Sequence, residues 1–107
     1  MKYYIQANLT MTTPSKQDGL FKEFQGKIGG KKVWGDVIWS KGQTEDGKPS
    51  LNSEIRFDNE LDMNESFAFL KAMMIKVPVL GGVISKHPCP HDEGKSCDPN
   101  TVERFEI

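Results

Sequence analysis

The side chains with the clearest potential for chemistry lie near the end of the chain, in the segment HPCPH at positions 87–91 and at Cys97. Imidazole nitrogens and thiolate sulfurs are the ligands that tetrahedral zinc prefers, usually in pairs separated by two to four residues. Here one residue separates successive ligands and prolines stiffen the segment, so we expect the four side chains not to meet at one ion. The sequence therefore predicts a metal-free loop with reduced cysteines. A zinc site and a Cys89 to Cys97 disulfide are the alternatives.

His87 has a second possible role. The alternation that begins at Val83 puts it at the end of a predicted strand, on the same face as Val83. A histidine in such a place can act as a general acid or base near neutral pH, and His87 is the one candidate catalytic residue. No partner can be placed beside it from the sequence, so the catalytic residues stay unknown and a structural histidine is the alternative.

Two residue periods outline the elements that position these side chains. Alternation of apolar and polar residues predicts strands over 2–10, 31–40, 50–58, 83–87 and 101–107. Apolar residues at helical spacing predict one helix from Thr13-Pro14 to Gly29-Gly30. They predict a second helix that begins near Asp62 or Asn64, with Asp62 and Glu65 as a capping box, and ends at Pro78.

This order predicts an α+β fold, the ferredoxin-like βαββαβ arrangement with an extra C-terminal strand that pairs with the strand before it. Two helices would cover one face of an antiparallel sheet, and residues 1–107 would form a single domain. The other face would carry polar residues of the first and third strands and two apolar residues of the second: Tyr4, Gln6, Asn8, Asn52, Glu54, Arg56, Trp34 and Ile38.

Charge and hydropathy disfavour several classes of partner. The net charge is -1, so no cationic field attracts nucleic acid or anionic lipid. The RNA-recognition module shares the predicted topology, but Asn52, Glu54 and Arg56 stand where it needs stacking aromatics. The chain shows neither the apolar run of a signal peptide nor a membrane span, so we expect a cytoplasmic protein without nucleic-acid or membrane partners.

Phenylalanine and methionine dominate the apolar stripes of the two predicted helices. Methionine adapts to irregular space, which favours a small-molecule cavity, although a core packed by bulky residues is the simpler alternative. The predicted ligand contacts combine this core with the opposite sheet face: Tyr4, Phe24, Trp34, Arg56, Phe67, Met74 and His87.

The pattern of the chain resembles the dimeric α/β-barrel superfamily of ferredoxin-like proteins. The resemblance covers nearly the whole chain and is carried by KYYIQANLTM, IRFDNELDMNESFAFLKAMM and VPVLGGVISKHP. The superfamily includes muconolactone isomerases, small cofactor-free monooxygenases and stress-responsive barrel proteins. It implies that the sheets of two subunits pack face to face, with ligands in apolar pockets near the sheet. The loop 88–100 departs from the pattern.

We therefore expect a homodimer formed through the sheet faces, in which Trp34 and Ile38 are buried. Its expected function is to bind, or to convert without a cofactor, an apolar or amphiphilic molecule such as a fatty acid, a polyketide-like compound or an aromatic compound. A protein-interaction or regulatory module without a small-molecule ligand is the alternative.

Overall fold

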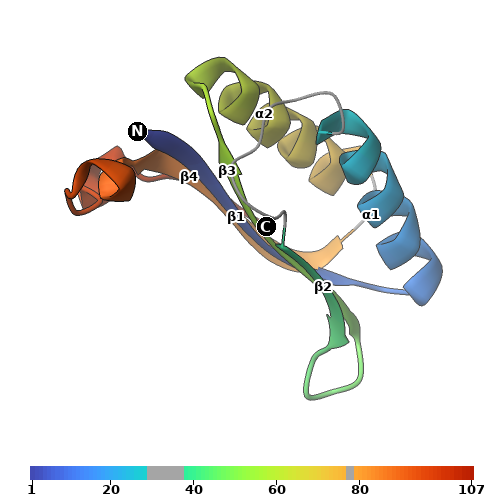
Figure 1. Ribbon diagram of the computed structural model, residues 1–107. Coiled ribbons are helices and arrows are strands. Elements are labelled where there is room, and N and C mark those ends of the chain that lie inside the picture. Colours follow the sequence, from blue (N-terminus) through green and yellow to red (C-terminus); the bar gives the residue numbers. More distant parts are fainter. Residues whose placement is uncertain (29–37, 77–78) are drawn as a thin grey trace.

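The computed structural model describes residues 1–28, 38–76 and 79–107 (Figure 1). The described elements are two helices, five strands and two short 3-10 turns. In chain order they are β1 (Lys2–Met11), α1 (Pro14–Ile28), β2 (Ile38–Gln43), β3 (Pro49–Phe57), α2 (Glu60–Lys76), β4 (Val79–Cys89), η1 (Pro90–Glu93), η2 (Pro99–Thr101) and β5 (Glu103–Glu106).

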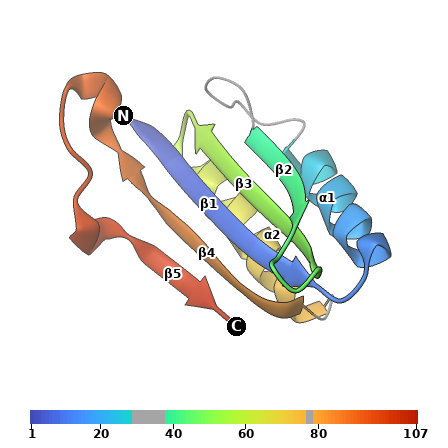
Figure 2. The same ribbon diagram turned by 90° about the horizontal axis from the view of Figure 1, so that it is seen from below.

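The strands form one antiparallel sheet in the order β2-β3-β1-β4-β5. Both helices lie on one face of this sheet, and Figure 2 shows the other face, here called the open face, in front of them. The predicted ferredoxin-like α+β fold is confirmed. The expected terminal pairing is also present, with Ile84 opposite Phe105 in β4 and β5.

The core lies between the sheet and the helices. The odd-numbered residues of β1 and β3 face the helices, as their alternation predicts, so Ile5 and Ile55 are paired and almost completely buried. Period two assigns every other side chain to one face, which explains why the sequence identified this layer correctly. The buried apolar residues of the helices are Leu20 and Phe24 of α1 and Met63, Phe67, Leu70, Met73 and Met74 of α2.

Helix α1 begins where the sequence predicts. The Lys16 backbone N–H donates to Thr13 Oγ1 (3.3 Å), and the Gln17 N–H donates to the Thr13 carbonyl oxygen (3.2 Å). Thr13 thus caps the helix, and Pro14 takes the first helical position, where no N–H donor is needed.

The predicted start of α2 is wrong. The helix begins at Glu60, and its cap is Asn59, whose Oδ1 accepts a hydrogen bond from the Asp62 backbone N–H (2.9 Å). Asp62 thus lies in the first turn, and the predicted capping box of Asp62 and Glu65 is replaced by a cap three residues earlier. Asparagine and aspartate are about equally good caps, so residue type alone does not choose between Asn59 and Asp62.

Two predicted strands differ in length from the observed ones. β4 runs over 11 residues to Cys89, whereas the sequence predicts a strand over 83–87. Pairing with β1 continues to Cys89, which lies opposite Lys2, and this pairing extends the strand. β2 continues to Gln43, beyond the predicted end at residue 40, while its predicted beginning, including Trp34, lies outside the described residues.

No described helix is long and apolar enough to cross a lipid bilayer.

Candidate functional site

Three of the predicted ligand contacts meet on the open face. In the sheet register Tyr4 of β1 lies opposite Arg56 of β3 on one side and His87 of β4 on the other. Directly opposed residues of antiparallel strands share a face, so the three side chains are neighbours. The Tyr4 and His87 ring centroids are 5.1 Å apart, and the Arg56 guanidinium carbon lies 5.0 Å from the Tyr4 centroid.

The Tyr4 hydroxyl is held in place by a carboxylate. It donates a hydrogen bond to Glu54 Oε1 over 2.8 Å. Burial raises the pKa of Tyr4 well above its usual value, and the hydrogen bond to Glu54 raises it further. Tyr4 is therefore a neutral phenol at any physiological pH. Its half-buried ring lies between the side chains of Arg56 and His87.

Arg56 has hydrogen-bonding capacity that no described residue uses. Among the residues that the structure describes, its guanidinium makes no hydrogen bond and no ion pair, and its recorded contact is with the Tyr4 ring. A guanidinium offers five N–H donors in a planar fork that matches a carboxylate or phosphate. Arg56 is half-buried, so water only partly supplies the missing acceptors.

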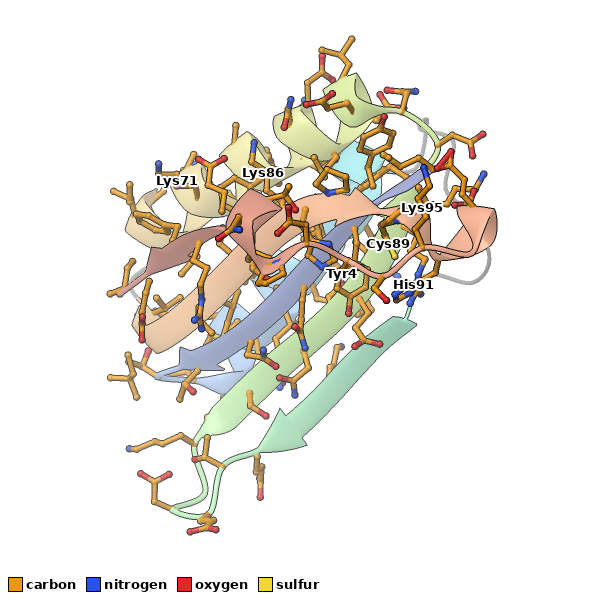
Figure 3. All side chains as sticks on the ribbon, turned by 90° about the vertical axis from the view of Figure 1, so that its left-hand side faces the viewer. Tyr4, Lys71, Lys86, Cys89, His91 and Lys95 are labelled. Atoms are coloured by element: carbon orange, nitrogen blue, oxygen red, sulfur yellow. The ribbon has the colours of Figure 1, made fainter. Side chains whose placement is uncertain are left out.

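The loop after β4 brings Cys89, His91 and Cys97 together; these three residues are here called the Cys/His cluster. Cys89 Sγ lies 3.6 Å from His91 Nδ1, Cys97 Sγ lies 3.5 Å from His91 Nε2, and the two sulfurs are 3.8 Å apart. One donor atom from each residue can be chosen so that all three lie within 4.8 Å of one another. Figure 3 shows Cys89 and His91 beside Tyr4.

The four potential ligands do not all meet, as the sequence predicts, but three of them do lie together. Cys89 ends β4, and the turn η1, which begins at Pro90, brings His91 back over Cys89. His87 does not join the cluster. Its ring lies against Tyr4, and its Nδ1 is 2.9 Å from the Pro88 carbonyl oxygen.

The three residues of the Cys/His cluster differ in their exposure to solvent. The Cys89 side chain is buried, Cys97 is half-buried and His91 is exposed. Burial raises the pKa of the Cys97 thiol, and the neighbouring Cys89 sulfur acts in the same direction. Both cysteines are free thiols in this structure.

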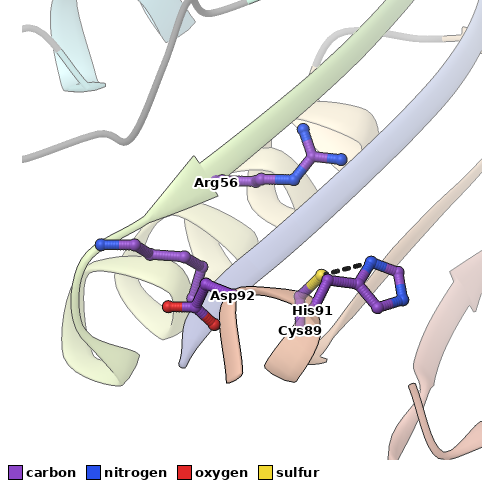
Figure 4. A pocket seen from close by; sticks show the side chains of 5 residues that line it. Arg56, Cys89, His91 and Asp92 are labelled. Atoms are coloured by element: carbon purple, nitrogen blue, oxygen red, sulfur yellow. Dashed lines mark hydrogen bonds between the residues drawn. The ribbon is translucent and has the colours of Figure 1, made fainter. Parts of the chain in front are cut away.

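The cluster and the open-face residues border the same space. A hollow of about 260 Å³ is lined by Tyr4, Arg56, His87, Cys89, His91 and Cys97. A second hollow of about 200 Å³ is lined by Lys2, Arg56, Cys89, His91 and Asp92 (Figure 4). Arg56, Cys89 and His91 belong to both, so the two hollows are parts of one candidate site.

The seven predicted ligand contacts thus do not form one site. Phe24, Phe67 and Met74 are buried in the core on the helix-covered face, and none of them lines a hollow described here. Trp34 lies outside the described residues. The predicted ligand contacts did not include Cys89, His91 and Cys97, which the sequence offered only as zinc ligands, although the two prolines that begin the loop turns, Pro90 and Pro99, are a signal of local folding.

Comparisons with known proteins show similarity only to solved structures. No family model matches this chain, and neither does any curated protein. Among solved structures, the chain is similar to SnoaB, a cofactor-independent oxygenase from Streptomyces nogalater. The similarity has a TM-score of 0.47 and 6% sequence identity, and it covers 99% of this chain and 89% of that chain. At these values the similarity carries no conclusion about superfamily, activity or ligand.

Proposed function

We propose that the protein binds a small aromatic or amphiphilic acid in the hollow on the open face, with the acid group on Arg56. The observation that carries this proposal is the guanidinium of Arg56 beside the Tyr4 ring, at the border of both hollows, where no described residue makes a hydrogen bond or ion pair with it. This function is the predicted small-molecule binding, with Tyr4, Arg56 and His87 as contacts and without the core residues.

The chemistry of the three side chains matches such a ligand. A carboxylate can accept two parallel N–H hydrogen bonds from Arg56, which are about twice as strong as hydrogen bonds between neutral groups. The Tyr4 and His87 rings offer apolar surface for the body of the ligand. Small-molecule sites usually have volumes of about 300 to 1,000 Å³, so the larger hollow is just below this range in a single chain.

We also propose that a second copy of the chain covers the open face. Both helices lie on the opposite face, so this side of the sheet is not covered by either of them (Figure 2). The face carries both signs of charge, with Glu54 and Arg56 on β3 and Arg104 and Glu106 on β5. A two-fold pairing can place opposite charges together and enclose the ligand hollow.

If the bound acid is also converted, we assign the role of general acid or base to His87. Its Nδ1 faces the Pro88 carbonyl oxygen, which favours the tautomer with the hydrogen on Nδ1. Nε2 then has a free lone pair in a side chain that lines the hollow. This assignment needs no cofactor.

Pairs of probes that differ in charge test the acid contact. Laurate and dodecanol, and benzoate and benzyl alcohol, are titrated into the protein by calorimetry. We expect the acids to bind more tightly than the alcohols, and Arg56→Gln to weaken acid binding by about 10- to 100-fold, which is the usual effect of losing a charge-assisted hydrogen bond. Lys22→Gln is the control, because Lys22 is an exposed cation of α1, on the helix-covered side of the sheet, and lines neither hollow.

Equal effects of the two substitutions would refute the acid contact. A protein that binds neither acids nor alcohols would support the alternative function, a protein-interaction module.

Light scattering tests whether a second copy covers the open face. We expect twice the chain mass of 12.1 kDa, and a measured mass of one chain contradicts the dimer. Trp34→Glu is the variant that the sequence predicts to dissociate it.

A further inference from the structure

The two sulfurs of the Cys/His cluster are as far apart as two ligands of one tetrahedral ion, and each sulfur is at ligand-to-ligand distance from one nitrogen of His91. Two thiolates bound to Zn²⁺ at about 2.3 Å lie about 3.8 Å apart, and a thiolate and an imidazole nitrogen lie about 3.6 Å apart. The structure has 3.8 Å between the two sulfurs, and 3.6 and 3.5 Å between sulfur and the nearest imidazole nitrogen. We propose that Cys89, His91 and Cys97 bind one divalent transition-metal ion of the zinc type.

One adjustment completes the site. The two sulfurs approach different nitrogens of His91, Cys89 the Nδ1 atom and Cys97 the Nε2 atom. Only one nitrogen can bind the ion that the two sulfurs share, so the ring must turn until that nitrogen faces both. His91 is exposed, so no packed side chain has to move to allow this rotation.

The loop is built to hold the three donors without the ion. The turn η1 has proline at its first position and ends at Gly94, whose φ of 73° suits glycine and whose N–H donates to the His91 carbonyl oxygen (3.1 Å). The turn η2 begins directly after Asp98, whose carboxylate caps it by accepting from the Asn100 N–H (2.9 Å). Cys97 precedes this capped turn, so both flanks of the cluster are anchored.

The two thiolates and one imidazole favour a particular class of metal ion and leave one of its four coordination positions open. Two thiolates and one imidazole suit zinc-type ions better than Mg²⁺ or Ca²⁺, which prefer oxygen. A tetrahedral ion with three protein ligands has a fourth position for water or another ligand. Two thiolates cancel the charge of a divalent ion, so the loaded site is neutral and Arg56 does not oppose it. The proposal stands without the acid ligand proposed above.

A disulfide is the competing outcome for the two sulfurs. They are 3.8 Å apart, and a bond would require them to approach to about 2.05 Å. Oxidation would consume both thiolates and remove the metal site. The state of the cysteines in the isolated protein therefore decides between the two.

Cobalt provides the direct test. The full chain is purified under reducing conditions, freed of metal with a chelator and titrated with Co²⁺. We expect one Co²⁺ per chain, with the sulfur-to-cobalt charge-transfer absorption and the intense visible bands of a tetrahedral site, and displacement of Co²⁺ by Zn²⁺. Native mass spectrometry of protein that has not been treated with chelator is expected to show one zinc ion per chain.

Variants separate the cluster from its neighbours. His91→Gln and Cys97→Ser remove donors that are not fully buried, and each should weaken Co²⁺ binding more than about tenfold. His87→Gln and Lys95→Gln are the controls, a histidine outside the cluster and an exposed loop residue, and both should keep the affinity. Arg56→Gln should also keep it, so failure of the acid proposal and failure of the metal proposal can be told apart. Circular dichroism confirms that each variant is folded.

Three results would overturn the proposal. The first is a folded, reduced protein that takes up no Co²⁺. The second is a cobalt spectrum that His91→Gln and Cys97→Ser leave unchanged. The third is freshly isolated protein without zinc whose mass is lower by two hydrogen atoms, which would assign the sulfurs to a disulfide.

Discussion

Tyr4 and Glu54 are joined across β1 and β3 by a hydrogen bond of 2.8 Å from the phenol to the carboxylate. In the register Tyr4 lies opposite Arg56 and Glu54 lies opposite Gln6, so the two partners are diagonal neighbours. Diagonal pairs are within reach of long side chains, and this one fixes the hydroxyl of Tyr4, whose side chain lines the candidate site. The bond therefore connects the packing of the open face to the geometry of the hollow.

We predict that Tyr4→Phe lowers the free energy of unfolding at neutral pH by about 1 to 2 kcal/mol, because a partly buried hydrogen bond to a charged group is lost. The raised pKa of Tyr4 adds a pH dependence. Above about pH 10 the unfolded phenol loses its proton while the folded one keeps it, so stability falls as the pH rises. Urea titrations at about pH 8 and pH 11 should show a smaller fall in Tyr4→Phe; equal falls would contradict the assignment.

Gly82 of β4 is expected to tolerate no side chain. A Cβ at this position would lie 2.6 Å from Leu9 Cδ2 and 3.1 Å from the Asn8 carbonyl oxygen, both on β1. We predict that Gly82→Ala destabilises the protein by about 1 to 3 kcal/mol through overpacking. Gly26→Ala is the control, since nothing lies within 4 Å of its Cβ position in α1, and it should stabilise by about 0.5 to 1 kcal/mol. Thermal unfolding measures both, and similar shifts would contradict this packing.

Phe67 of α2 belongs to the core. Its side chain is 4% exposed, so Phe67→Ala should lower the free energy of unfolding by about 3 to 5 kcal/mol, through lost burial and a residual cavity. Ile75→Ala on the same helix is the control: Ile75 is 69% exposed, and the expected change is within about 0.5 kcal/mol. A cost below about 1 kcal/mol for Phe67→Ala in urea unfolding would mean that the side chain borders open space.

Gln17 links α1 to the sheet. Its buried amide nitrogen donates to the Ser50 carbonyl oxygen over 2.6 Å and to the Gly42 carbonyl oxygen over 3.4 Å. Gln17→Met keeps the volume and should cost about 1 to 2 kcal/mol, whereas Gln17→Glu places a carboxylate against two carbonyl oxygens and should cost more. Chemical denaturation at neutral pH gives both values. The reverse order would show that the amide does not act as the donor.

Much of the fold could be predicted because alternation carries a direct geometric meaning. In β1 and β3 each step of one residue reverses the side chain, so the sequence alone places Ile5 and Ile55 in the core and Tyr4 and Arg56 on the opposite face. The start of α2 was wrong because Asn59 and Asp62 have similar capping preferences. The choice between them depends on where β3 ends, and only the tertiary structure gives that end point.

The candidate site, like the fold, could be predicted only in part from the sequence. Residue types alone identified His87, Cys89, His91 and Cys97 as candidate zinc ligands, and their spacing along the chain argued against all four meeting at one ion. The distances between them follow from the path of the loop through two capped turns, which depends on backbone dihedrals that the spacing does not determine. The sequence determined which side chains share a face of a strand. The tertiary structure decided which strand ends and turns lie side by side, because pairing of β1 with both β3 and β4 joins segments that are far apart in the chain.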